Sequence, residues 1–229
     1  MAINLNTQNL TLYGRDETGS VAIEALLTEG AIPFSLVNVP GNNVTDAKDI
    51  QARDAYRAIN PLGQVPALKI SPKSGGGRDI FMTESAAIML WLGDCGQMEL
   101  AKAGFFVPNQ DDSLRADYLR WLFFFATEHY QTHLFFAYAK RWTNDNPDHV
   151  AVQRAKAQEA IDRQLNMVEQ RLGTAAYFFG DKASPLDFYA AMLFGWHSNI
   201  SQFPRSAALM KRMASRPLSA AIWARHKIG

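Results

Sequence analysis

The stretch of residues 60–93 constrains the fold more than any other part of this chain. It begins with a turn and a short apolar strand entered through a proline, NPLGQVPAL at 60–68. A glycine-rich turn, SPKSGGGRD, separates that strand from a second one, which runs into a helix start at 83–85. The pattern predicts a strand, hairpin, strand and helix unit, with polar groups gathered where the helix begins.

The residues ahead of this unit add two further strand and helix pairs. Short apolar strands are expected at 10–14 and 32–39, and helical stretches at 21–28 and 46–59. Residues 1–96 therefore carry the order β-α-β-α-β-β-α.

Every later signal is helical. Residues 97–112 have no clear period and are interpreted as a linker. Apolar spacing then predicts helices over 113–142, 147–172, 184–198, 204–215 and 217–227. Ser184-Pro185-Leu186-Asp187 has the pattern of a capping box with a proline in the first turn. The expected domains are 1–96 and 113–229.

Composition argues against several classes of partner. The 229 residues include 23 basic and 22 acidic side chains, a balance that favours neither nucleic acid nor a membrane surface. No run of about 18 apolar residues is present, and the first residues lack the features of a signal peptide. The single cysteine, Cys95, cannot form an intrachain disulfide and is expected to be inert. We expect a cytoplasmic protein.

The order and spacing of these segments resemble the cytosolic glutathione S-transferase family. The likeness is greatest to bacterial members whose first loop ends in Gly-Ser, as in LYGRDETGS at 12–20. It covers nearly the whole chain and implies a thioredoxin-like α/β N-terminal domain with a four-stranded mixed sheet, followed by an all-α C-terminal domain. It also implies a homodimer that uses glutathione as co-substrate.

The resemblance places the glutathione contacts in the stretch 60–93. It implies that the Val65-Pro66 bond is cis and that Val65 meets the cysteinyl part of glutathione, with Gln64 as a further contact. Glu84 and Ser85 would hold the γ-glutamyl ammonium and carboxylate, which suits a helix N-terminus. Purely structural interpretations also exist, namely an edge-strand proline and a helix cap.

Thiol activation needs one hydroxyl near the sulfur. A free thiol has a pKa of about 8.5, and one hydrogen bond to the thiolate lowers it by about one to two units. Ser20 is ranked first because Gly19-Ser20 matches the bacterial subgroup, Thr18 second, and Tyr13 third. Each of Thr18 and Ser20 also suits a plain capping role.

An aromatic helical stretch follows residue 113 in the sequence. By resemblance, one edge of it lines an apolar pocket for the second substrate, and core packing is the competing interpretation. The residues assigned to that edge are Tyr118, Trp121, Phe125 and His129. No metal site is expected, because His129 and His133 have no third ligand at suitable spacing.

The expected function is conjugation of glutathione to a small hydrophobic electrophile, as in detoxification. Glutathione-dependent peroxidase, isomerase or dehalogenase activity remains open. So does a non-enzymatic module that binds glutathione without turnover.

Overall fold

The computed structural model describes residues 5–74 and 76–229, and the chain divides into two compact units. The first unit contains the residues up to 107 together with 214–229, and the second contains 108–213. The C-terminal residues 214–229 thus belong to the first unit, whereas the sequence pattern grouped them with the helical domain.

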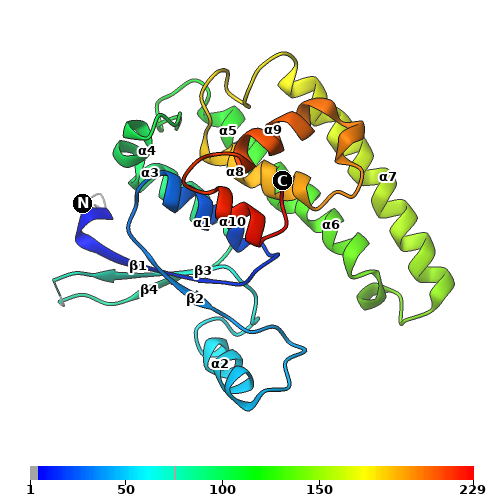
Figure 1. Ribbon diagram of the computed structural model, residues 1–229, viewed down its shortest axis with the longest axis horizontal. Coiled ribbons are helices and arrows are strands. Elements are labelled where there is room, and N and C mark those ends of the chain that lie inside the picture. The colour runs from blue at the N-terminus through cyan, green and yellow to red at the C-terminus, as the bar shows by residue number, and fades with distance from the viewer. Residues whose placement is uncertain (1–4, 75) are drawn as a thin grey trace. The chain divides into compact units, whose positions relative to one another are not determined.

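The first unit is built on a four-stranded mixed sheet with the order β2-β1-β3-β4 (Figure 1). β1 runs parallel to β2 and antiparallel to β3, and β3 pairs antiparallel with β4. This arrangement confirms the thioredoxin-like fold and the predicted order of elements. The strands are β1 (Gln8–Gly14), β2 (Ser35–Asn38), β3 (Ala67–Pro72) and β4 (Ile80–Met82).

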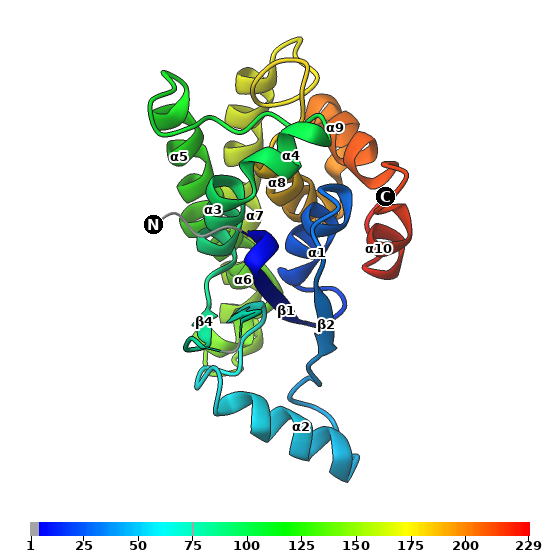
Figure 2. The same ribbon diagram turned by 90° about the vertical axis from the view of Figure 1, so that its left-hand side faces the viewer.

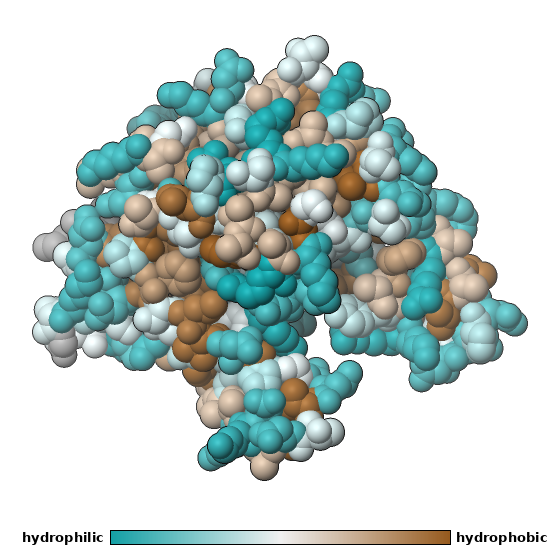
Figure 3. All heavy atoms as spheres, in the orientation of Figure 1, coloured by the Kyte–Doolittle hydropathy of each residue, from teal (hydrophilic) through white to brown (hydrophobic). Residues whose placement is uncertain are grey.

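Three helices cover the two faces of this sheet (Figures 1 and 2). α1 (Ser20–Glu29) and α3 (Ser85–Cys95) lie on one face, and α2 (Ala47–Arg57) lies on the other. The side chains of Leu12 and Leu68 are fully buried in this unit, and each such leucine contributes about 1.5–3 kcal/mol. α2 buries only Tyr56, and the region of Figure 3 over α2 is mainly hydrophilic.

The second unit contains a long helical stretch that changes its winding. α5 (Arg115–Phe123) continues into η2 (Phe124–His129), which is a π-helical turn, and then into α6 (Tyr130–Ala137) and the 3-10 turn η3 (Ala139–Trp142). π-Helical turns inside α-helices are rare. The sequence predicted one long helical stretch over 113–142 and left a kink open, and the π-helical turn and the 3-10 turn change the winding within it.

The remaining long helices match their predicted positions closely. α7 (Pro147–Leu172) begins at Asn146, whose side chain accepts hydrogen bonds from the Asp148 and His149 amides. The helices that follow α7 are α8 (Pro185–Gly195) and α9 (Pro204–Ala214).

The capping box at the start of α8 is confirmed. Asp187 accepts hydrogen bonds from the Ser184 amide at 2.7 Å and the Ser184 hydroxyl at 2.6 Å. It also accepts one from the Phe178 amide at 3.0 Å. Burial raises the pKa of Asp187 to about 6, although these three donors act in the opposite direction.

Smaller elements depart from the predictions. Residues 97–102, expected within a linker, form α4 (Gln97–Lys102), which is too short to show a period and buries only Leu100. The last helix is limited to α10 (Ala220–Arg225), and short 3-10 turns occur at η1 (Leu5–Thr7) and η4 (Ile200–Gln202). Two predictions fall partly outside the described residues. The glycine-rich turn includes Gly75, and the first segment, in which we looked for a signal peptide, includes residues 1–4.

No helix within residues 5–74 and 76–229 has the length and apolar character needed to span a bilayer.

Candidate functional site

Three segments that the sequence analysis assigned to the binding site converge at one edge of the sheet. β1 ends there at Gly14, and the register sets Tyr13 opposite Ala67 at the start of β3. β4 runs antiparallel to β3 with Met82 opposite Leu68, so it ends at the same edge. The loops after β1, before β3 and after β4 therefore lie close together.

The segment before β3 is fixed by side chains from α2 and from the turn after it. The Tyr56 hydroxyl donates to the Gln64 carbonyl at 2.7 Å, and the Asn60 amide donates to the same oxygen at 2.8 Å. Gly63 has φ +64°, a conformation that glycine adopts without steric cost. The turn thereby holds the Gln64 main chain at one position.

The residues that follow this turn match the expected arrangement. The Val65–Pro66 bond is cis, as the resemblance implied. Pro66 is buried, while Val65 is half-buried and the Gln64 residue is exposed. Val65 and Gln64 therefore present surface at the sheet edge.

Glu84 stands at the N-cap of α3 in an unusual backbone conformation. Its φ of +64° and ψ of 104° lie in a region that side chains rarely adopt, and no side chain caps the helix. Residues held in sparsely populated conformations cost about 1–3 kcal/mol and cluster at functional sites. Glu84 is exposed and Ser85 half-buried, so both have accessible surface at the helix N-terminus.

The loop between β1 and α1 holds two of the candidate hydroxyls. The Ser20 hydroxyl donates to the Arg15 carbonyl at 3.0 Å and accepts from the Arg15 amide at 3.2 Å. The Thr18 hydroxyl donates to the same carbonyl at 2.6 Å. Ser20 is only 1% exposed, whereas Thr18 is half-buried. The two hydroxyls thus share one acceptor and differ in accessibility.

Tyr13 is the third candidate and lies on the face of the sheet toward α2. Its ring contacts the Tyr56 ring with centroids 5.5 Å apart. It packs with Val65 against the cluster that includes Val39 and Ala67. Tyr13 therefore lies beside the segment before β3, which neither of the loop hydroxyls is shown to contact.

Arg15 has a different environment from the other arginines near this edge. Arg53 and Arg57 both contact the Asp54 carboxylate, at 2.9 and 3.4 Å. The Arg15 Nε is buried and has no hydrogen-bond partner among the residues the structure describes. Of the three arginines, Arg15 retains the most capacity to meet an anionic group.

The four aromatic and histidine side chains assigned to a pocket edge are all buried in the second unit. Tyr118, Trp121, Phe125 and His129 are 0–4% exposed. Phe125 and Trp121 pack edge-on against Phe178. The four residues thus contribute to the core of their own unit and present almost no surface to a ligand in this structure.

His129 belongs to a buried polar network behind this core. Its Nδ1 lies 2.8 Å from the Gln164 Oε1, and its ring contacts that of His133. Burial lowers the pKa of His129 to about 4, and the hydrogen bond to Gln164 opposes this only in part. In the described part of the chain, no group of three or more His, Cys, Asp or Glu side chains is arranged to hold a metal ion.

Cys95 ends α3 away from the converging loops. Burial, with a smaller effect of the nearby Asp94 charge, raises the pKa of its thiol. A protonated thiol is a poor nucleophile. Cys95 therefore lacks the environment of a reactive cysteine.

The structure adds residues that the sequence did not assign to the site. Arg225, His226 and Lys227 contact the loop that carries Thr18 and Ser20. No local sequence pattern points to these residues, because they pair with a loop about 200 positions away in the chain.

Two family models match the chain. They are the glutathione S-transferase N-terminal domain, over residues 21–95, and the glutathione S-transferase C-terminal domain, over residues 131–217. The chain belongs to the cytosolic glutathione S-transferase family, in its bacterial type, and the enzyme class is glutathione S-transferase with the specific reaction left open.

Individual relatives agree with this assignment. The GST-like protein YncG of Escherichia coli K12 is 27% identical over 205 residues, covering 90% of each chain. The glutathione S-transferase GstA of Escherichia coli O157:H7 is 27% identical over 212 residues, covering 91% of this chain and 94% of its own. A glutathione transferase homologue from Sulfitobacter has a similar fold, with TM-score 0.72, 23% identity, and coverage of 96% of this chain and 99% of its own.

Proposed function

We propose that this protein binds glutathione at the sheet edge formed by residues 13–20, 64–66 and 84–85, and transfers it to a hydrophobic electrophile. The Val65 main chain meets the cysteinyl part of glutathione, and Gln64 lies near the same ligand. Glu84 binds the γ-glutamyl ammonium, and Ser85 binds the α-carboxylate together with the helix N-terminus.

The left-handed conformation of Glu84 at the start of α3 carries this proposal. A non-glycine residue with φ +64° at an exposed helix N-terminus has no evident benefit for folding. Binding of a zwitterionic ligand end would explain this conformation, because it places the Glu84 carboxylate, which suits an ammonium, next to the positive end of the helix dipole, which suits a carboxylate.

The thiol is activated by a hydroxyl of the first loop. We now rank Thr18 before Ser20 as the activating residue, because Thr18 is half-buried while Ser20 is 1% exposed. The Ser20 hydroxyl also donates to the Arg15 carbonyl and accepts from the Arg15 amide. Tyr13 remains the third candidate. The N-terminus of α1 favours a thiolate over a thiol at the same place.

The relatives support glutathione as the ligand. The Sulfitobacter structure contains bound glutathione, and a sphingomonad glutathione S-transferase of similar fold is a complex with glutathione. An apolar electrophile, a homodimer, a cytoplasmic location and a role in detoxification complete the proposal. The pocket for the electrophile is assigned to the surface of the helical stretch that carries Tyr118, Trp121, Phe125 and His129. Because these four side chains are buried, exposed Phe123 of the same stretch offers the apolar surface.

Calorimetric titration with glutathione tests the binding site. We expect binding to wild type, and at least tenfold weaker binding to Glu84→Gln, because the ammonium loses its charged partner. Glu159→Gln, an exposed residue of α7, is the matched control and should bind as wild type. Equal affinity of all three proteins would contradict the assignment of Glu84.

A second candidate function is glutathione binding without turnover, or with peroxidase, isomerase or dehalogenase chemistry. The burial of the Ser20 hydroxyl favours binding without turnover if Thr18 and Tyr13 are also inactive. A conjugation assay with a panel of aromatic electrophiles separates these cases. Binding without any conjugation would support the alternative.

A further inference from the structure

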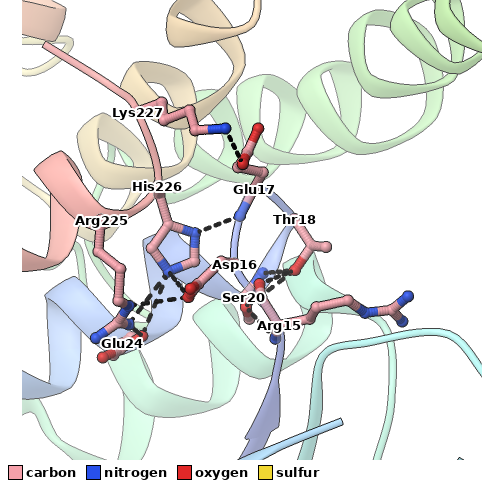
Figure 4. Close-up of polar contacts among 9 residues, drawn as sticks. All are labelled: Arg15, Asp16, Glu17, Thr18, Ser20, Glu24, Arg225, His226 and Lys227. Atoms are coloured by element: carbon pink, nitrogen blue, oxygen red, sulfur yellow. Dashed lines mark hydrogen bonds and ion pairs between the residues drawn. The ribbon is translucent and has the colours of Figure 1, made fainter. Parts of the chain in front are cut away.

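The C-terminal residues 225–227, here called the clamp, contact the loop between β1 and α1 within the first unit (Figure 4). The clamp and the acidic residues of the loop and α1 form several ion pairs and hydrogen bonds. These join Arg225 to Asp16 at 2.9 Å and to Glu24, His226 to the Glu17 amide at 3.0 Å, and Lys227 to Glu17 at 2.6 Å.

His226 makes the central contact of the clamp. The Glu17 amide N–H donates to its Nδ1, so Nδ1 carries no proton. The proton is then on Nε2, which lies 3.6 Å from Glu24 Oε2 and 3.7 Å from Asp16 Oδ1. His226 is 2% exposed, so its ring is fixed between the loop and α1.

The contact with His226 is made by a residue in an unusual backbone conformation, Glu17. Its φ is +58°, in the left-handed region that residues with a side chain rarely occupy. The bond to His226 stabilises that conformation through the Glu17 amide. Thr18 is the next residue, so the conformation of Glu17 sets the direction of the Thr18 hydroxyl.

Glu24 anchors the clamp on α1. Its side chain is nearly buried and lies between Arg225 and His226. Burial acts to raise the pKa of Glu24, but hydrogen bonds to His226 and Arg225 outweigh it, and the pKa is lowered. The carboxylate is therefore charged in the folded protein and holds both clamp residues.

We propose that His226 is a positioning residue for thiol activation. It holds Glu17 in its left-handed conformation and thereby keeps the Thr18 side chain where its hydroxyl can turn from the Arg15 carbonyl, to which it donates in the ligand-free protein, to the bound thiolate. Neither His226 nor Arg225 is assigned a contact with glutathione. The inference rests on the proposed function, because it requires a thiol beside Thr18.

A matched pair of substitutions tests this role. His226→Asn places an amide oxygen where Nδ1 lies and preserves the acceptor for the Glu17 amide. His226→Gln places its polar end where Nε2 lies and removes that acceptor. The measurements are hydrogen exchange of the Glu17 amide in the ligand-free protein and the pKa of bound glutathione, from the ultraviolet absorbance of the thiolate. His226→Ala is the full truncation.

We expect fast Glu17 exchange in His226→Gln and His226→Ala, and retained protection in His226→Asn. The thiol pKa should rise by about one unit in the first two variants. At pH values below the pKa, this reduces the thiolate fraction about tenfold. His226→Asn should keep both values near wild type. Glutathione affinity should fall by less than the tenfold loss of thiolate, since the γ-glutamyl contacts are intact.

The outcomes separate this inference from the proposed function. If Glu17 exchange increases but the bound thiol keeps its pKa, His226 has only a structural role and the inference is wrong, while the proposed function stands. Equal behaviour of His226→Asn and His226→Gln would also overturn it. If wild type binds no glutathione, the proposed function fails and the positioning role fails with it, whatever the exchange shows.

Discussion

The hydroxyl oxygens of Thr18 and Ser20 lie 3.0 Å apart, and both hydroxyls reach the carbonyl oxygen of Arg15. The two residues nevertheless differ. Ser20 is buried and accepts a hydrogen bond from the Arg15 amide at 3.2 Å, whereas Thr18 is half-buried and accepts a longer one from the Ser20 amide at 3.4 Å. This difference assigns a mainly structural role to Ser20 and a more accessible hydroxyl to Thr18.

The stability of two single variants should reflect that difference. Ser20→Ala leaves the Arg15 amide without its acceptor, and we expect a loss of about 1–3 kcal/mol in the free energy of unfolding. Thr18→Val should cost less than about 1 kcal/mol, because the Arg15 carbonyl retains Ser20 as a donor and the bond that the Ser20 amide loses is long, at 3.4 Å. Urea denaturation at pH 7 measures both. A larger loss for Thr18→Val would contradict these assignments.

Glu84 should show opposing effects on stability and on binding. Glu84→Gly removes the steric cost of φ +64°, about 1–3 kcal/mol, but adds about 0.4–1 kcal/mol of unfolded-state entropy. We therefore expect unchanged or higher stability, together with much weaker glutathione binding. Glu84→Gln should weaken binding without the gain. Thermal unfolding and calorimetry give the two quantities. Retention of full affinity by the glycine variant would show that the conformation of Glu84 serves no ligand.

Glu29 should contribute strongly to the attachment of the C-terminal segment. Its buried carboxylate accepts from the Ser219 amide and hydroxyl, each at 2.9 Å, and pairs with Arg216 at 3.1 Å. We expect Glu29→Gln to reduce the free energy of unfolding by about 3–5 kcal/mol, as for other broken buried pairs.

The control for Glu29 is an exposed ion pair. Lys156 and Glu159 are 2.8 Å apart, with side chains 70% and 62% exposed. Glu159→Gln should change stability by less than about 1 kcal/mol. Similar losses in Glu29→Gln and Glu159→Gln would indicate that Glu29 does not hold the segment.

The sequence predicted the first unit better than the second. The cis bond at Pro66 was implied by the family resemblance. The order of elements in residues 1–96, and the capping box at Asp187 in the second unit, follow from local signals such as turn residues, alternation and cap spacing. Each of these patterns is contained within a few neighbouring residues, so no tertiary knowledge was needed.

The remaining differences depend on contacts between distant residues. The clamp joins residues 16–24 to residues 225–227, and no local pattern encodes that pairing. The apolar spacing of Tyr118, Trp121, Phe125 and His129 predicts a buried face, but it cannot separate a core from a pocket. The π-helical turn at η2 likewise has no periodic signal in the sequence.

The buried histidine of the second unit predicts a pH-dependent stability. His129 has its pKa lowered to about 4, so on acidification the unfolded state binds a proton that the folded state refuses. Its contribution is present above pH 6.5 and is lost as the pH falls toward 4, by up to about 3 kcal/mol. His133 acts in the same direction, since burial also lowers its pKa.

Comparison with His129→Gln isolates this effect. The free energy of unfolding of wild type should fall more steeply between pH 7 and 5 than that of the variant. Asp187 acts oppositely, because its raised pKa of about 6 stabilises the fold as the pH falls from 6 to 4, but it is common to both proteins and cancels. Parallel curves would show that His129 does not titrate differently on folding.

The pKa of the thiol of bound glutathione tests the central claim most directly. Ultraviolet titration of the complex should give a value about one to two units below the 8.5 of a free thiol. Thr18→Val should return the thiol pKa toward the free value, while Tyr13→Phe and Ser20→Ala should change it less. An unshifted pKa in wild type, or the same lowered pKa in all three variants, would contradict activation by a hydroxyl of residues 13–20.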